Sequence, residues 1–175
     1  PDYPVDAIIG HIHYISNNFD EAIEAYEKVD RSKMEKMDMI EYTTSCYFTQ
    51  KYDKGLDMAT YGLQKEPRNS TLNRMAMFCN TEKGDYEKAI DYADRLFNKS
   101  DSANISYMDY VYYGNALNGL KKHDEAIAMF QKALDQEFDN KDKRAGVIQT
   151  LANAYKGMED YPNALKYYEQ YLNEA

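Results

Sequence analysis

The sequence is poor in the residues that break helices or shape tight turns. It holds 8 glycines and 4 prolines in 175 residues, which is few for a fold made of many short strands. Long stretches of Ala, Glu, Lys, Leu and Met run without a breaker, and these residues favour helix. The composition therefore predicts an all-α protein.

Cysteine and histidine are also scarce. Cys46 and Cys79 are 33 residues apart, and neither has a Cys or His at metal-ligand spacing, so both are expected to be buried core thiols. His11 and His13 are two apart on a helix and point to different faces, which prevents them from sharing a metal. His123 replaces an aromatic residue of the repeat described below, which indicates a structural role. With no Gly-rich phosphate loop and no nucleophile elbow, the sequence predicts no metal, no cofactor and no enzymatic activity.

Long apolar runs and an excess of basic residues are both absent. Hydrophobic residues make up 43% of the chain and charged residues 29%, but no apolar run approaches the ~20 residues of a membrane span. We therefore expect a folded chain that does not insert into a membrane. Asp and Glu outnumber Lys and Arg by 30 to 21, so the net field repels phosphate backbones and nucleic acid is not expected as a partner.

The compartment is left open by the sequence. The first residue is Pro rather than Met, and the chain ends in a helical pattern without a cap, which favours a piece of a longer precursor. Cytoplasmic is the default expectation, and an extracytoplasmic location follows if a signal peptide was removed.

The sequence contains an internal repeat. Five segments align on a small residue followed by an aliphatic one, and we call this small residue the anchor. The anchors are Ala22, Gly55, Ala89, Ala126 and Ala164. They are 33, 34, 37 and 38 residues apart, a period that indicates an array of similar structural units.

Other positions recur at fixed distances from each anchor. Three residues before it stand Phe19, Tyr52, Tyr86, His123 and Tyr161, and four residues after it stand Tyr26, Ala59, Ala93, Phe130 and Tyr168. Twelve residues before it, in a preceding helical stretch, stand Gly10, Thr43, Met77, Gly114 and Ala152. Short polar breaks such as 83–85 separate the two stretches, so each unit is predicted to be an antiparallel pair of helices.

Two features depart from a regular repeat. In the third unit, Met77 is larger than the Gly, Thr or Ala at the same position of the other units, and Asn80 is not aromatic. The segments FNKSDSAN (97–104) and DNKDKR (139–144) account for the longer anchor spacings. We expect both segments to be loops between units, with a hinge as the alternative.

The spacing, the anchors and the paired helices resemble the tetratricopeptide repeat family. The best single match is YGNALNGLKKHDEAIAMFQKAL, where Gly114, Ala126, Phe130 and Ala133 occupy the family's small and aromatic positions. Pro67 stands where the family places a helix-ending proline. The resemblance covers nearly the whole chain and implies a right-handed α-solenoid of antiparallel helix pairs in one array. Its approximate repeats are 3–35, 36–69, 70–104, 107–140 and 145–175.

The resemblance also implies a protein–protein interaction scaffold whose concave groove is lined by the first helix of each pair and binds a protein or peptide. The groove residues predicted from the positions 15, 11 and 8 before the anchors are His11, Tyr14, Thr44, Tyr47, Arg74, Phe78, Asn115, Asn118, Asn153 and Lys156. Aromatic side chains in the first half would hold apolar groups of a partner, and Asn115 and Asn153 would hold its backbone. Alternatively, the aromatics pack between adjacent first helices, and the asparagines are usual for the family.

A second hypothesis is that the array is an assembly element. Tyr168, Tyr171 and Leu172 would leave an apolar C-terminal edge unless something covers it, because repeat arrays need a polar end cap. This edge could pack against further repeats or against a second copy, giving a homo-oligomer.

Overall fold

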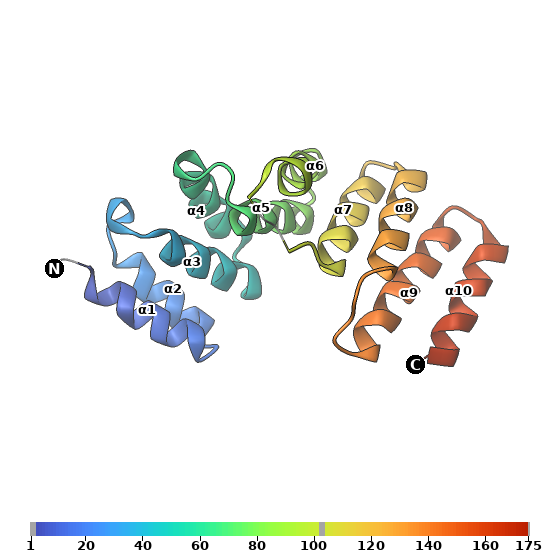
Figure 1. Ribbon diagram of the computed structural model, residues 1–175, viewed down its shortest axis with the longest axis horizontal. Helices are drawn as coiled ribbons and strands as arrows, with labels where there is room; N and C mark the ends of the chain where they lie inside the picture. The colour runs from blue at the N-terminus through green and yellow to red at the C-terminus, as the bar shows by residue number, and fades with distance from the viewer. Residues whose placement is uncertain (1–2, 102–103, 175) are drawn as a thin grey trace. The chain divides into compact units, whose positions relative to one another are not determined.

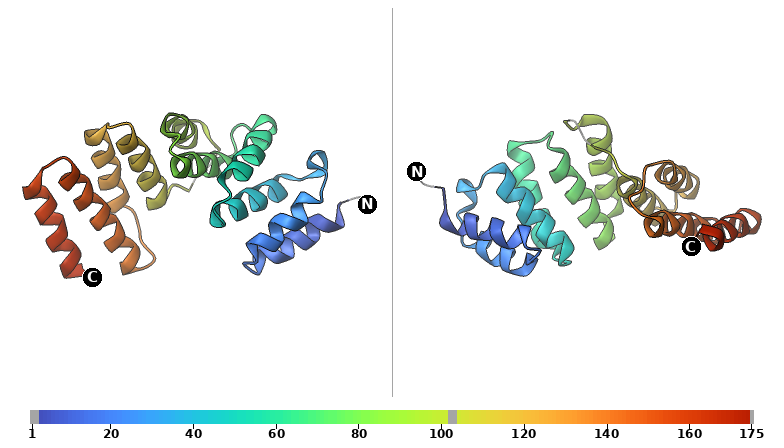
Figure 2. Two further views of the ribbon diagram at one scale, coloured as in Figure 1. Left: turned by 180° about the vertical axis from the view of Figure 1, so that it is seen from behind. Right: turned by 60° about the horizontal axis from the view of Figure 1, so that its bottom comes forward.

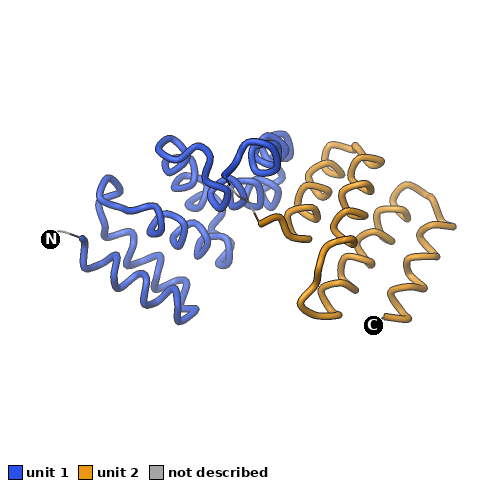
Figure 3. Tube along the Cα trace, viewed as in Figure 1, with its two compact units in different colours: residues 1–103 blue, residues 104–175 orange. Residues whose placement is uncertain are grey.

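The computed structural model describes residues 3–101 and 104–174, and the regular structure in these residues is entirely helical. They form ten α-helices and two short turns of other helix types, η1 and η2 (Figure 1). The chain divides into two compact units, residues 1–103 and 104–175 (Figure 3). The all-α class and the paired helices are confirmed, and one continuous array across both units stays a prediction.

Unit 1 contains three helix pairs, and the two helices of a pair lie side by side in Figures 1 and 2. Its elements are α1 (Val5–Ile15), α2 (Phe19–Glu27), η1 (Arg31–Lys33), α3 (Lys36–Phe48), α4 (Tyr52–Lys65), α5 (Ser70–Lys83), α6 (Tyr86–Asp94) and η2 (Arg95–Lys99). Unit 2 contains two pairs, formed by α7 (Tyr107–Gly119), α8 (His123–Leu134), α9 (Lys141–Gly157) and α10 (Tyr161–Glu174).

Every pair is joined by the same turn. A residue with positive φ lies five positions before each anchor: Asn17, Gln50, Gly84, Lys121 and Glu159. In the first turn the backbone N–H of Asn18 donates to the carbonyl of His13 at 2.8 Å, and the other four turns repeat this bond at 2.8–3.0 Å. This is the hydrogen-bond pattern of a Schellman C-cap, which ends the first helix and reverses the chain.

Two segments that were predicted to be loops are partly helical. Helix α9 begins at Lys141, inside the predicted loop 139–144, because the side chain of Asn140 accepts a hydrogen bond from the Lys143 N–H at 2.9 Å and caps the helix. After α6 the chain continues through the π-helical turn η2, where Asn98 donates to Asp94 at 2.7 Å. The helical path therefore reaches Lys99 within the predicted loop 97–104, of which 102–103 lie outside the described residues.

The core of each pair is built on its anchor, and all five anchors are buried. The residue twelve before the anchor and the residue four after it combine a large side chain with a small one in four of the five units, and both are small in the second unit. These position pairs are Gly10 with Tyr26, Thr43 with Ala59, Met77 with Ala93, Gly114 with Phe130, and Ala152 with Tyr168. A Cβ on Gly114 would come within 2.4 Å of the Phe130 ring, and one on Gly10 within 2.9 Å of the Tyr26 ring. At least one member of each pair is small, because two large side chains would exceed the volume between the two helices.

This size rule accounts for the irregular third unit. Met77 is too large for the family's small position, but Ala93 opposite it is small, and both side chains are fully buried. The helix pair keeps its packed volume with the large residue moved from the second helix to the first.

Candidate functional site

Five aromatic side chains form a continuous ladder across unit 1. The ring centroids of Tyr14 and Phe19 are 5.9 Å apart, and those of Phe19 and Phe48 are 4.9 Å apart. Tyr47 lies 5.5 Å from Phe48 and 5.5 Å from Phe78. This aromatic ladder joins the turn between α1 and α2 to the middle of α5, at separations typical of favourable ring contacts.

The members of the ladder differ in their access to solvent. Phe48 is 57% exposed, Phe78 is only 5% exposed, and Tyr14, Phe19 and Tyr47 are half-buried. Phe78 therefore supports the ladder from inside, as the packing alternative expected, while Phe48 is largely exposed to solvent. Phe48, which stands seven residues before its anchor, was not predicted to be a groove residue, and Phe19 was predicted only to pack in the repeat.

Among the other predicted groove residues of unit 1, His11 has the clearest partner. Its Nδ1 lies 2.9 Å from Oε1 of Glu41, a carboxylate that is buried and also accepts a hydrogen bond from the Tyr26 hydroxyl at 2.7 Å. Burial and the hydrogen bond to Glu41 raise the pKa of Tyr26 well above its usual value. Thr44 and Arg74 are half-buried. His11 therefore helps to satisfy a buried carboxylate from the solvent side.

In unit 2 the predicted groove residues lie on α7 and α9. Asn115, Asn153 and Lys156 are exposed, and Asn118 is half-buried. Two of the amides are already engaged, because Asn118 Oδ1 lies 2.8 Å from Nδ1 of His123 and Asn153 Oδ1 accepts a hydrogen bond from the Tyr168 hydroxyl. Of the two asparagines expected to hold a partner's backbone, Asn153 has an amide oxygen that is already occupied, whereas Asn115 has an exposed side chain.

The two cysteines are buried free thiols, as expected. Burial raises the pKa of Cys46 and of Cys79 to about 12. A thiol with so high a pKa is protonated at neutral pH and is a poor nucleophile. Among the described residues, no group of three or more His, Cys, Asp or Glu side chains could hold a metal ion.

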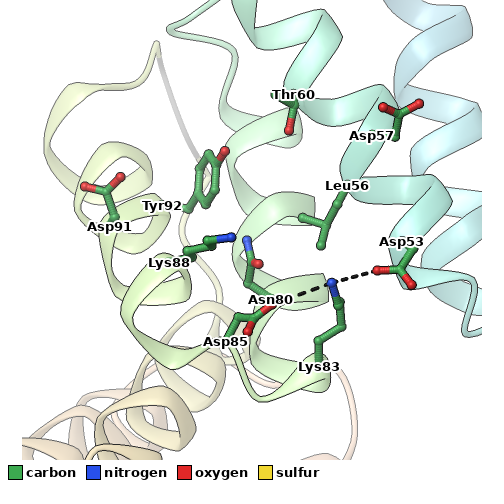
Figure 4. Close-up of a pocket in the computed structure, with 10 residues that line it drawn as sticks. All are labelled: Asp53, Leu56, Asp57, Thr60, Asn80, Lys83, Asp85, Lys88, Asp91 and Tyr92. Carbon is green, nitrogen blue, oxygen red and sulfur yellow. Dashed lines mark ion pairs between the residues drawn. The ribbon is translucent and has the colours of Figure 1, made fainter.

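A cleft of about 570 Å³ lies between α4 and α6 (Figure 4). Lys83 of α5 lines this cleft. Its Nζ lies 2.6 Å from a carboxylate oxygen of Asp53 and 3.5 Å from a carboxylate oxygen of Asp85. The hydrogen bond with Asp53 raises the pKa of Lys83. The cleft is thus lined by charges that already neutralise one another in part.

No helix within 3–101 or 104–174 combines the length and apolarity required to cross a membrane.

The geometry defines the class of protein: an all-α repeat protein built from two-helix units with a shared turn and a shared anchor. Comparison with known families matches the tetratricopeptide repeat over residues 105–173 and again over residues 7–33. These segments together span more than half of the chain, and the chain belongs to the tetratricopeptide repeat family.

Solved structures with the same fold include several named MamA. "MamA AMB-1 C2221" is 18% identical with a TM-score of 0.77, and the match covers 97% of this chain and 96% of that one. "MamA 41-end from Desulfovibrio magneticus RS-1" is 13% identical with a TM-score of 0.83, covering 99% and 97% of the two chains. At these identities the likeness shows the fold. No curated protein matches the sequence.

Proposed function

We propose that this protein is a non-catalytic interaction scaffold that holds a partner protein or peptide against the first helices of its repeats. The aromatic ladder of unit 1 carries the proposal, because it places an exposed Phe48 among half-buried rings that are held in position by their neighbours. Aromatic side chains in such supported positions dominate the binding energy of many interfaces. The raised pKa values of Cys46 and Cys79 support a role without nucleophilic chemistry.

The proposed partner is an extended segment with apolar side chains at intervals. Its apolar groups would contact the ladder, and polar groups at the margin, such as His11 and Thr44, would contact its backbone. In unit 2 the exposed side chains of Asn115 and Lys156 would provide the equivalent polar contacts.

The test compares two exposed apolar residues on the same helix. Phe48→Ala removes the exposed ring of the ladder, and Met37→Ala removes a side chain of α3 that is also exposed but lies outside it. Proteins captured by the wild type from source-cell lysate should be retained by Met37→Ala and lost by Phe48→Ala. Equal recovery by both variants would exclude the ladder as the binding surface.

A second candidate function is self-association through the C-terminal edge. Leu165 is 59% exposed and Leu172 is 73% exposed on α10, so the edge is apolar as expected. Its composition differs from the prediction, because Tyr168 and Tyr171 are half-buried and Leu165 and Tyr161 are exposed instead. A rise in mass with concentration, measured by light scattering, would support this function.

A further inference from the structure

Helix α1 presents an unusually apolar face to solvent. Val5, Ile8, Ile9 and Ile12 stand 17, 14, 13 and 10 residues before the anchor Ala22, and we call them the acceptor stripe. Ile8 is 47% exposed and Ile12 is 53% exposed. Isolated apolar residues at a surface are ordinary, but four on one helical face form a patch that favours association.

The same four positions are covered in other repeats. They hold Asp38, Glu41, Tyr42 and Ser45 in α3; Leu72, Met75, Ala76 and Cys79 in α5; and Val147, Thr150, Leu151 and Ala154 in α9. All of these residues are buried except Thr150 and Ala154, which are half-buried. In each case the second helix of the preceding repeat makes the larger contact: α2 on α3, α4 on α5, and α8 on α9. The first helix of the preceding repeat adds a smaller contact to α3 and to α5.

The covering helix uses its own fixed positions, one, four and eight residues after the anchor. In α4 these are Leu56, Ala59 and Leu63, which pack in one cluster with Leu72 and Ala76 of α5. In α10 the same positions hold Leu165, Tyr168 and Leu172, which we call the donor stripe. Leu165 and Leu172 are exposed there. In residues 3–101 and 104–174, most of the acceptor stripe and most of the donor stripe are therefore exposed to solvent.

We propose that the acceptor stripe on α1 binds the donor stripe on α10 of a second copy, so that copies join head to tail. This proposal rests on the self-association proposed above for the C-terminal edge, and it adds the surface on α1 to which that edge binds. The register follows from α4 and α5, where a Cβ on Gly62 would come within 2.8 Å of Leu72 Cδ1, so the end of the covering helix meets the start of the next. By equivalence, Leu172 lies against Val5 and Leu165 against Ile12.

Polar residues at the margin agree with this register. Across the contact between α8 and α9, Gln131 Nε2 donates to the Tyr155 hydroxyl at 3.1 Å. These residues stand five after one anchor and nine before the next, and the equivalent positions of the two stripes hold Glu169 and His13. A carboxylate of one copy therefore meets an imidazole of the other, and the imidazole N–H can donate to it.

Such a contact joins two different surfaces. In a complex of two copies, the donor stripe of one copy and the acceptor stripe of the other therefore remain exposed. Heterologous contacts of this kind extend into linear chains unless a rotation closes them. One helix against one helix buries less area than a stable dimer interface, so association is expected only at high protein concentration.

The experiment uses two double variants of the full chain. Val5→Glu with Ile12→Glu alters the acceptor stripe, Leu165→Glu with Leu172→Glu alters the donor stripe, and Met37→Glu is the control at an exposed apolar residue outside both. In sedimentation velocity over a concentration series, the sedimentation coefficients of wild type and of Met37→Glu should rise with concentration. Each double variant should stay monomeric, its association weakened more than about tenfold. An equimolar mixture of the two double variants should form a heterodimer and no larger species. One variant supplies the intact donor stripe, the other supplies the intact acceptor stripe, and the remaining two stripes are altered.

The outcomes separate the contact from self-association in general. If one double variant still dimerises alone, the protein self-associates through a symmetric contact and the head-to-tail arrangement is wrong. If wild type remains monomeric at all concentrations, both self-association and its arrangement are wrong. As a check that does not depend on the acidic variants folding, Val5→Cys and Leu172→Cys proteins mixed under oxidation should form the mixed disulfide in preference to either homodimer. Statistical mixing of the three species would contradict the register.

Discussion

The helix pair α5–α6 of unit 1 and the pair α7–α8 of unit 2 fill the same space with large and small residues exchanged. In α5–α6 the large residue is Met77 on the first helix and the small one is Ala93 on the second. In α7–α8 the first helix has Gly114 and the second has Phe130, whose ring lies where a Cβ on Gly114 would be. These two helix pairs therefore have a similar summed volume at the two positions although the residue at each position differs.

The largest expected effect comes from breaking this compensation in α5–α6. Ala93→Phe places a ring against the buried Met77 and should lower the free energy of unfolding by about 3 kcal/mol. Adding Met77→Gly recreates the arrangement of α7–α8 and should recover most of that loss. Urea denaturation of the two single variants and the double variant measures the coupling. Additive losses would mean that the two positions do not share one volume.

A second variant tests the opposite arrangement in unit 2. Gly114→Ala should cost about 2 kcal/mol, because the added Cβ would come within 2.4 Å of Phe130. Gly146→Ala on α9 is the matched control, since nothing lies within 4 Å of its Cβ position. It should raise stability by about 0.5–1 kcal/mol through helix propensity. The comparison fails if the two thermal melts shift in the same direction.

Tyr26 and Phe130 occupy the same repeat position but differ in one hydroxyl group. Tyr26→Phe should lower stability by about 1.5 kcal/mol, because the buried Glu41 loses a hydrogen-bond donor. The pKa of Tyr26 is raised above 10.0 in the folded chain. Its contribution is therefore fully present below pH 10 and is lost as pH rises, by roughly 1.4 kcal/mol per pH unit. Denaturation at several alkaline pH values should show a smaller slope for Tyr26→Phe, and an unchanged slope would contradict the assignment.

The smallest effect concerns the turns of the two pairs. Gly84 has φ of 82° in the α5–α6 turn, and Lys121 has φ of 62° at the same position in α7–α8. Gly84→Ala should cost about 1 kcal/mol, whereas Lys121→Gly should change stability by no more than about 0.5 kcal/mol. Thermal melts of the two variants measure the difference. If Gly84→Ala and Lys121→Gly lowered stability by the same amount, the expected difference between the two turns would be wrong.

The sequence predicted the helix pairs, their turns and the buried anchors, because these depend on residues close together in the chain. It did not predict the start of α9, where Asn140 acts as a cap inside a segment that had the composition of a loop. It placed Phe78 in a partner groove, but the neighbouring Tyr47 and the fold around α5 leave only 5% of that side chain exposed. Phe48 was overlooked because its position in the repeat carries no common chemistry.

The sequence by itself determined the unit: two antiparallel helices joined by a short polar turn, with a small anchor in the second helix. Local propensity and periodic burial suffice for these features. The tertiary structure alone decided which repeated positions are covered. Val5 and Val147 stand at the same place in their repeats. Val147 is buried where α8 packs on α9, whereas Val5 is exposed, and no helix within the described residues covers that face of α1.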